Sequence, residues 1–154
     1  MKIYSFTDKA DSIQDTLYSD VGVSAYDKTK DNRAQFEPGR TKTFRGVWDT
    51  GANCSVITQK IIDALSLEPV NFTVIGHAHG FADTEEYMVN FALPNGIGVF
   101  RLRVVRGVMD DFDILIGMDI INRGDFAVSN FNGKTTFNFR IPSIADTDLR
   151  VSDV

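Results

Sequence analysis

The sequence predicts an all-β domain, a small closed barrel or sandwich with one or two short helices. Short runs rich in Val, Ile, Phe and Thr recur along the chain, and each is closed by Gly, Pro, Asn or Asp, which is typical of strands joined by turns. Only two short segments have helical spacing. The 154 residues suit one domain, and 43% hydrophobic with 24% charged residues is ordinary for a globular protein.

The first 48 residues predict a polar N-terminal segment followed by a hairpin. Residues 1–15 are polar after a short apolar run, so we expect an arm, an edge strand or a removable extension there. The main domain is expected over residues 16–142. Within it, residues 16–26 alternate loosely and residues 40–48 are rich in β-formers, so a hairpin across residues 28–39 is the simplest connection.

The middle of the domain predicts a short strand, a short helix and a longer hairpin. Residues 54–57 are the strand. The segment "TQKIIDALSL" has Thr58 as a candidate N-cap and three apolar side chains on one face, and Pro69 helps to end the helix. Residues 70–94 predict two strands about a glycine-bounded bend at 76–80.

Two more strands and a second helix are expected next. Residues 96–107 alternate apolar and polar side chains. Residues 112–117 form a short apolar run, typical of a strand that is buried on both faces. "MDIINRG" then predicts one or two helical turns, with Asp119 as a candidate cap and Gly124 as the stop.

The chain closes with a hairpin and a tail. Residues 125–130 and 134–141 flank Asn132-Gly133, a strong turn dipeptide. The sequence becomes acidic after this hairpin, and we expect residues 143–154 to be a flexible tail.

Charge and composition exclude several classes of function. A net charge of −5 argues against a nucleic-acid or acidic-membrane binder. No apolar run approaches the roughly 20 residues that span a bilayer, and the start has no secretory apolar core. The single cysteine excludes an intrachain disulfide framework. We therefore expect a cytoplasmic protein.

The stretch "VWDTGANCSVIT" places Asp49-Thr50-Gly51 at the end of an apolar run. A single ionised Asp is a poor general base near neutral pH, whereas two carboxylates in contact share a proton and supply both an acid and a base. By itself the triplet is a weak signal, and three residues alone favour an ordinary turn at the end of a strand.

Two further stretches change this interpretation. "ILIGMD" at 114–119 is an apolar run that enters a glycine and a short helix, and "VIGHAHGF" at 74–81 is a glycine-rich bend between strands. Together with the triplet, and in this order, they resemble the retropepsin family of aspartic proteases over about residues 40–139. The "ILIGMDII" stretch is especially similar to bacterial and cellular members.

The resemblance implies a fold of the acid-protease type and a role for each matched residue. Asp49 would be the catalytic aspartate, Thr50 would bond between the two active-site loops, and Gly51 would approach the water and the substrate. Gly117 would pack beneath the active-site loop, where a side chain would collide. The implied substrate-binding residues are Ala52, Asn53, the flap residues Gly76, His77, Ala78, His79 and Gly80, and Leu115 and Ile116, which line the pocket or the core behind it.

The single Asp-Thr-Gly supplies half of a catalytic pair, so the second carboxylate must come from another copy across a two-fold axis. The sequence thus predicts a homodimeric aspartic endopeptidase that acts on a polypeptide or polyprotein and needs no metal or organic cofactor. Its substrate could include its own N-terminal residues. A catalytically silent dimerisation or peptide-binding module of the same fold is the alternative.

The chain departs from the viral pattern at two positions. Viral members usually carry an acid after Asp-Thr-Gly-Ala and an Arg after the later glycine, and these two pair near the dimer interface. Asn53 and Met118 stand at those positions here, so both halves of the ion pair are absent.

Other candidate sites have ordinary explanations. His77 and His79 are spaced like metal ligands, but zinc needs three or four ligands and the chain has no further His. Cys54 lacks a positioned base nearby in the sequence, which favours a small apolar role. The acids of "MDDFD" have no EF-hand spacing and indicate a solvated turn. Trp48 is expected in the core.

Overall fold

The computed structural model describes residues 1–150, which are mostly β. The strands are β1 (Tyr4–Lys9), β2 (Tyr18–Ala25), β3 (Lys42–Trp48), β4 (Val56–Ile57), β5 (Asn71–His77), β6 (Gly80–Leu93), β7 (Ile97–Arg106), β8 (Ile114–Ile116), β9 (Asp125–Ser129) and β10 (Thr136–Ile141). The α-helices are α1 (Gln59–Leu65) and α2 (Met118–Ile121), and 3-10 turns span Ala34–Phe36, Pro94–Gly96 and Phe131–Gly133. Each strand and helix expected from the sequence is present.

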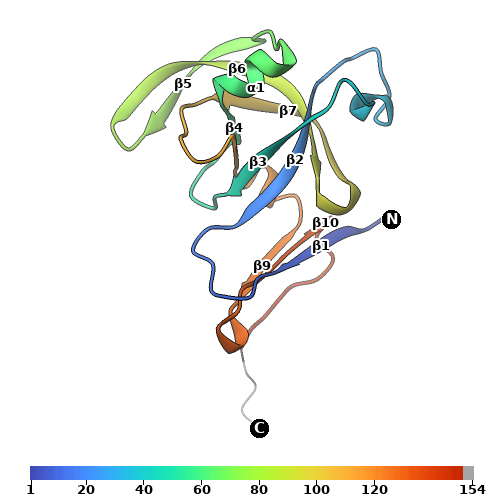
Figure 1. Ribbon diagram of the computed structural model, residues 1–154, viewed down its shortest axis with the longest axis vertical. Coiled ribbons are helices and arrows are strands. Elements are labelled where there is room, and N and C mark those ends of the chain that lie inside the picture. Colours follow the sequence, from blue (N-terminus) through green and yellow to red (C-terminus); the bar gives the residue numbers. More distant parts are fainter. Residues whose placement is uncertain (151–154) are drawn as a thin grey trace.

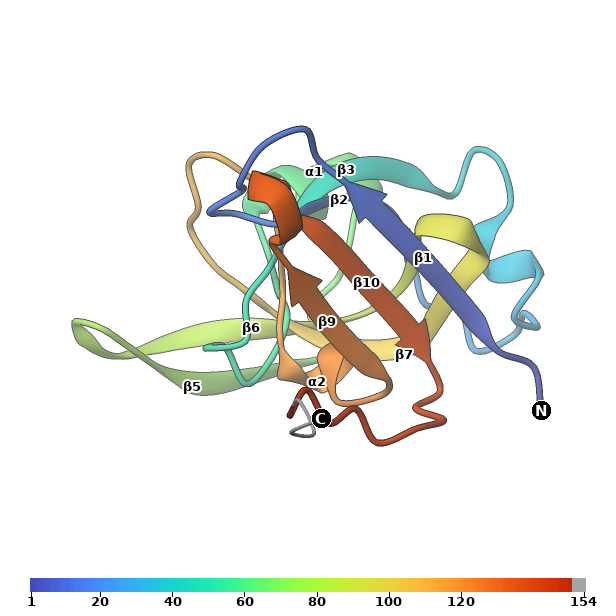
Figure 2. The same ribbon diagram turned by 90° about the horizontal axis from the view of Figure 1, so that it is seen from below.

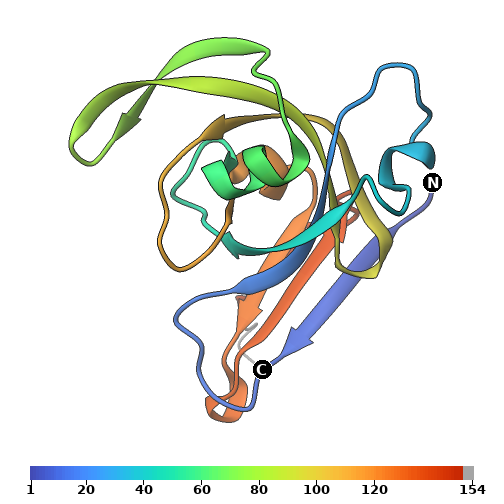
Figure 3. The same cartoon turned by 45° about the horizontal axis from the view of Figure 1, so that its top comes forward.

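Six strands close into a barrel. They follow the order β2-β3-β8-β4-β7-β6, and an additional pairing of β2 with β6 joins the two ends. Most neighbours are antiparallel, but β3 pairs with β8, and β4 with β7, in parallel. Within residues 1–150 the strand β5 pairs with β6 alone, and the β5–β6 hairpin extends beyond the barrel (Figures 1 and 3). The predicted small closed barrel is confirmed.

A second sheet of three strands lies against the barrel, in the order β1-β10-β9 (Figure 2). Its edge strand β1 pairs with β10 along its whole length, from Tyr4 opposite Ile141 to Lys9 opposite Thr136. Of the three roles expected for the start of the chain, residues 4–9 adopt that of an edge strand. Their removal would strip β10 of one of its two neighbours.

Aromatic side chains join the two sheets. Trp48, at the end of β3, is 7% exposed, and its ring packs 4.9 Å from that of Phe139 and 5.2 Å from that of Phe137. Phe6 of β1 packs on Phe137 at 5.3 Å. The indole N–H of Trp48 donates to the Ser19 hydroxyl at 2.9 Å, so its one polar group is satisfied. Trp48 is a core residue, as expected.

The two helices are short and sit where the sequence places them. Thr58 is the N-cap residue of α1, although its hydroxyl makes no capping bond. The helix ends at Leu65, and the C-cap residue Ser66 has φ 50°, before Pro69. The expected cap of α2 was wrong. Gly117 is the N-cap and Asp119 lies in the first turn, because the Asp119 carboxylate bonds elsewhere. No helix among the described residues is long and apolar enough to cross a membrane.

The first residues of the tail fold back onto the second sheet. The Ser143 hydroxyl and the Ile144 amide donate to the carboxylate of Asp125 in β9. The rest of the predicted tail is exposed up to residue 150, and residues 151–154 lie outside the described part of the chain.

Candidate active site

The loop of residues 49–55, between β3 and β4, carries the Asp-Thr-Gly triplet. The Asp49 amide donates to the Ile116 carbonyl at 2.9 Å, which extends the pairing of β3 with β8 by one step. The preceding residue, Trp48, is buried in the aromatic cluster. The strand behind Asp49 therefore holds its backbone rigidly.

The Asp49 carboxylate is oriented by its own loop. The carboxylate Oδ1 accepts a hydrogen bond of 2.8 Å from the Gly51 amide. The backbone carbonyl of Asp49 accepts one of 3.3 Å from the Ala52 amide. A Cβ on Gly51 would lie 3.1 Å from that Oδ1, which is close for a side chain. Asp49 is half-buried, whereas Thr50 and Gly51 are exposed. Such a carboxylate can act on a group that arrives from solvent.

The turn between β8 and α2 supports this loop from below. The Met118 amide donates to the Ala52 carbonyl at 2.8 Å. A Cβ on Gly117 would lie 2.7 Å from both the carbonyl carbon and the oxygen of Cys54, and 3.0 Å from the Ala52 oxygen. Gly117 thus packs beneath the loop with no room for a side chain, as the resemblance implied.

The sequence did not indicate a polar contact at the far end of the loop. The Ser55 hydroxyl donates to Asp119 Oδ1 at 2.7 Å, and the Ser55 amide donates to Oδ2 at 2.9 Å. The same hydroxyl accepts a bond of 3.1 Å from the Gly117 amide. Ser55 and Asp119 are 64 positions apart in the sequence, so no local spacing could have revealed the pair.

The predicted substrate residues near the loop have different exposures. Asn53 is exposed, and Ala52 and Leu115 are half-buried, so all three have surface to offer. Ile116 has no exposed surface. Of the two positions expected for Ile116, the pocket or the core behind it, the structure shows the core.

The β5–β6 hairpin carries the other predicted substrate residues at its tip. Gly76 lies opposite Phe81 and His77 opposite Gly80, and the whole tip is exposed. Gly80 has φ 123°, a conformation that other residues rarely adopt. Among residues 1–150, no hydrogen bond joins this tip to the loop of residues 49–55. The structure bonds Asp49 directly to Ile116, the neighbour of Leu115 in β8, whereas no such bond in the described part of the chain joins Asp49 to the tip.

The two histidines and the cysteine do not form a second centre. The His77 and His79 rings are 6.2 Å apart and exposed, and within residues 1–150 no group of three or more His, Cys, Asp or Glu is placed to hold a metal ion. Burial raises the pKa of the half-buried Cys54 thiol, and the Asp119 charge raises it further. A thiol that stays protonated is a poor nucleophile, which disfavours cysteine chemistry.

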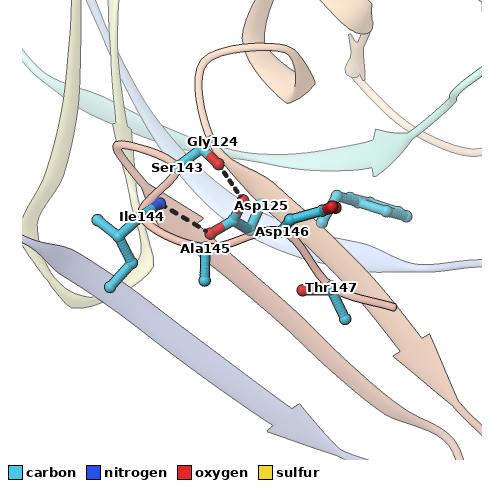
Figure 4. A pocket seen from close by; sticks show the side chains of 8 residues that line it. Gly124, Asp125, Ser143, Ile144, Ala145, Asp146 and Thr147 are labelled. Carbon is cyan, nitrogen blue, oxygen red and sulfur yellow. Dashed lines mark hydrogen bonds between the residues drawn. The ribbon is translucent and has the colours of Figure 1, made fainter. Parts of the chain in front are cut away.

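A cavity of about 670 Å³ lies away from this site, between the start of β9 and residues 143–147 (Figure 4). Its lining includes the acids Asp125 and Asp146, the hydroxyl residues Ser143 and Thr147, and the apolar residues Phe126 and Ile144. Asp125 bonds to Arg140, Ser143 and Ile144, so it ties the tail to the sheet. None of the predicted catalytic or substrate residues lines this cavity.

Comparisons with known proteins match the fold. No family model matches the sequence, and no curated protein matches it. The solved structure of a retropepsin-like aspartic protease from Rickettsia conorii aligns with a TM-score of 0.55 at 13% identity, over 92% of this chain and 97% of that one.

Two viral proteases align over less of the chain. The simian foamy virus (mac) protease has a TM-score of 0.45 at 16% identity, over 69% of this chain and 92% of its own. The EIAV protease, in complex with the inhibitor HBY-793, has a TM-score of 0.49 at 18% identity, over 71% and 88%. The fold assignment depends on the Rickettsia structure, which covers nearly the whole of both chains. The protein therefore has the fold of the retropepsin-like aspartic proteases.

Proposed function

We propose that the protein is a homodimeric aspartic endopeptidase in which two copies of Asp49, one from each subunit, activate a water molecule. The observation that carries this proposal is the position of Asp49-Thr50-Gly51. The triplet lies at the open end of a strand that is fixed behind it by the Ile116 contact and the Trp48 cluster, in a protein with the retropepsin-like fold.

Half of a catalytic pair is consistent with the geometry of one chain. The Asp49 carboxylate is half-buried and oriented by the Gly51 amide, and within residues 1–150 it has no carboxylate partner. The Thr50 side chain is exposed, and in the described part of the chain its hydroxyl makes no hydrogen bond. Both groups are therefore free to meet their counterparts across a two-fold axis.

The chemistry follows from two carboxylates that share one proton. The ionised carboxylate takes a proton from water as the water oxygen attacks the scissile carbonyl carbon. The protonated carboxylate gives its proton to the carbonyl oxygen and so stabilises the tetrahedral intermediate. Collapse of the intermediate breaks the C–N bond, and the leaving amine takes a proton from the pair. The pair itself supplies the acid and the base, so the proposal includes no metal or organic cofactor.

The β5–β6 hairpin would serve as the flap that covers an extended peptide. Its strands end at an exposed tip with glycines at 76 and 80, and backbone groups of such a hairpin can bond to a polypeptide as a strand does. The proposed contacts are the tip residues His77, Ala78 and His79, together with Asn53. A polypeptide or polyprotein substrate is the class that this arrangement favours. The expected cytoplasmic setting stays a prediction.

Cleavage of a peptide library or a denatured protein, measured at several pH values, tests the proposal. Wild type should cleave and Asp49→Asn should not, while Asp110→Asn, which changes an exposed acid outside the loop, should retain wild-type activity. Equal cleavage by wild type and Asp49→Asn would assign the activity to another group. No cleavage by either, at any pH, would favour the catalytically silent peptide-binding or dimerisation module.

A further inference from the structure

We propose that Asp119 is the positioning residue of the loop that carries Asp49, and that it acts through Ser55. This inference concerns the same site and rests on the proposed function for its catalytic consequence. Its structural part, the control of the loop by Asp119, stands on contacts within one chain.

Two hydrogen bonds join Asp119 to Ser55. The two carboxylate oxygens of Asp119 accept separately from the Ser55 hydroxyl, at 2.7 Å, and from the Ser55 amide, at 2.9 Å. Ser55 has no exposed surface, and its hydroxyl also accepts from the Gly117 amide at 3.1 Å. Every polar group of Ser55 that faces Asp119 is therefore paired, and water does not compete for it.

The segment from β8 to α2 holds the loop at three points. It binds the first residue through the Ile116 carbonyl and Asp49 amide, and the middle through the Met118 amide and Ala52 carbonyl. The contact of Asp119 with Ser55 is the third point and holds the last residue of the loop. The Ser55 carbonyl also accepts from the Val105 amide of β7 at 3.3 Å, but the Asp119 carboxylate is the partner of both the amide and the hydroxyl of Ser55.

The contact uses both oxygens of a carboxylate. Hydrogen bonds to an ionised acceptor are shorter and about twice as strong as neutral ones. An Asn at this position keeps the size of the side chain but offers one acceptor oxygen, so it cannot accept from both the amide and the hydroxyl of Ser55. Asp119→Asn therefore removes one of the two charge-assisted bonds and weakens the other, with little change in side-chain volume.

The experiment compares Asp119→Asn, Ser55→Ala, the double variant and Ser55→Thr, which keeps the hydroxyl. Asp113→Asn is the matched control, because the Asp113 carboxylate likewise accepts from a backbone amide, but Asp113 lies just before β8, outside the loop of Asp49. It pairs with Lys60 at 2.9 Å and accepts from the Arg45 amide at 3.5 Å. Full-length protein is used throughout.

The first measurement is amide hydrogen exchange by NMR, which needs no activity. In Asp119→Asn and in Ser55→Ala we expect the Met118 and Asp49 amides to exchange faster by about tenfold or more, while the amides between β2 and β3 keep their rates. Asp113→Asn should leave Met118 and Asp49 unchanged. A purely structural role would speed exchange at all of these amides together. Wild-type exchange at Met118 and Asp49 in both loop variants would overturn the proposal.

The second measurement is steady-state cleavage, provided that wild type cleaves. We expect kcat to fall about tenfold or more in Asp119→Asn with KM changed by less than about threefold, because the loop positions Asp49 rather than the substrate. The double variant should match the worse single variant, and Ser55→Thr should retain most of the activity. Additive losses, or an equal loss of kcat in Asp113→Asn, would contradict the positioning role. An inactive wild type would overturn the proposed function, and the exchange rates would still decide this inference.

Discussion

The amide of Asp49 donates to the carbonyl of Ile116 across 2.9 Å, and this bond places the proposed catalytic residue directly on the barrel. Ile116 has no exposed surface, so its carbonyl cannot move without disturbing the core. Asp49 is consequently the first residue beyond a rigid strand, and only its side chain and the following residues face solvent. A catalytic carboxylate needs such a fixed backbone and an open side.

The close packing of Gly117 beneath the loop predicts that a methyl group added at this position destabilises the protein. In Gly117→Ala, the added Cβ would lie 2.7 Å from the backbone carbonyl of Cys54, and backbone moves less readily than a flexible side chain. We expect a loss of about 1–3 kcal/mol in unfolding free energy and loss of cleavage. Urea denaturation and peptide cleavage measure the two effects.

The control for this variant is Gly39→Asn. Gly39 has φ 86°, a Cβ added there would have no neighbour within 4 Å, and Asn tolerates this backbone conformation. The strain of this backbone conformation leads us to expect a loss of about 1 kcal/mol, with cleavage retained. Equal stability of Gly117→Ala and wild type would show that the loop is not seated on Gly117.

The first strand predicts that the start of the chain contributes to stability. Phe6→Ala removes the ring that packs 5.3 Å from Phe137 and 6.1 Å from Trp48, and we expect a loss of about 1–3 kcal/mol. Deletion of residues 1–9 should destabilise the protein more, because it also exposes the edge of β10. Thermal unfolding followed by circular dichroism checks both. A deletion variant with the wild-type Tm would restore the idea of a removable extension.

Features formed by residues that are close together in the sequence could be predicted from it. The turn at Asn132-Gly133, the glycine-bounded bend at 76–80 and the Asp49 triplet are local patterns, and the structure contains each one where it was expected. Gly117 was also located, because the family motif includes its glycine.

Contacts between distant residues could not be predicted in this way. Ser55 meets Asp119 only after the barrel has closed, so Asp119 was expected to be a helix cap instead. The pairing of β1 with β10 joins the two ends of the domain, and no local pattern distinguishes an edge strand from a loose arm. The buried side chains of Gln35 and Asn90, bonded at 3.0 Å, form a further contact of this kind.

Asp27, in the loop before β3, predicts that part of the protein's folding stability is lost at low pH. The hydroxyl and amide of Thr29 donate to the Asp27 carboxylate and, with a smaller contribution from Arg40, lower the pKa of Asp27 from its ordinary 3.8 to about 2. Because the folded pKa is depressed, the ionised carboxylate stabilises the fold above about pH 4. That stabilisation is lost as the pH falls from about 4 to 2.

Asp27→Asn should therefore be less stable than wild type at pH 6 and should lose less stability between pH 4 and 2. Thr29→Ala removes the hydroxyl donor but keeps the amide, so its loss should begin at a higher pH than in wild type. Urea denaturation across this pH range gives the slopes. Parallel curves for wild type and Asp27→Asn would show that Asp27 titrates normally in the folded state.

The central claim, that two copies of Asp49 form one site, is tested most directly by mixing subunits. A fixed amount of wild type is equilibrated with increasing amounts of Asp49→Asn, and cleavage of a peptide substrate is measured. If both subunits supply a carboxylate, equal mixing leaves about half of the initial wild-type dimers, so cleavage falls to about half and continues to fall as more variant is added. Cleavage that stays constant, whatever amount of the variant is added, would show that each chain works alone and would contradict the shared site.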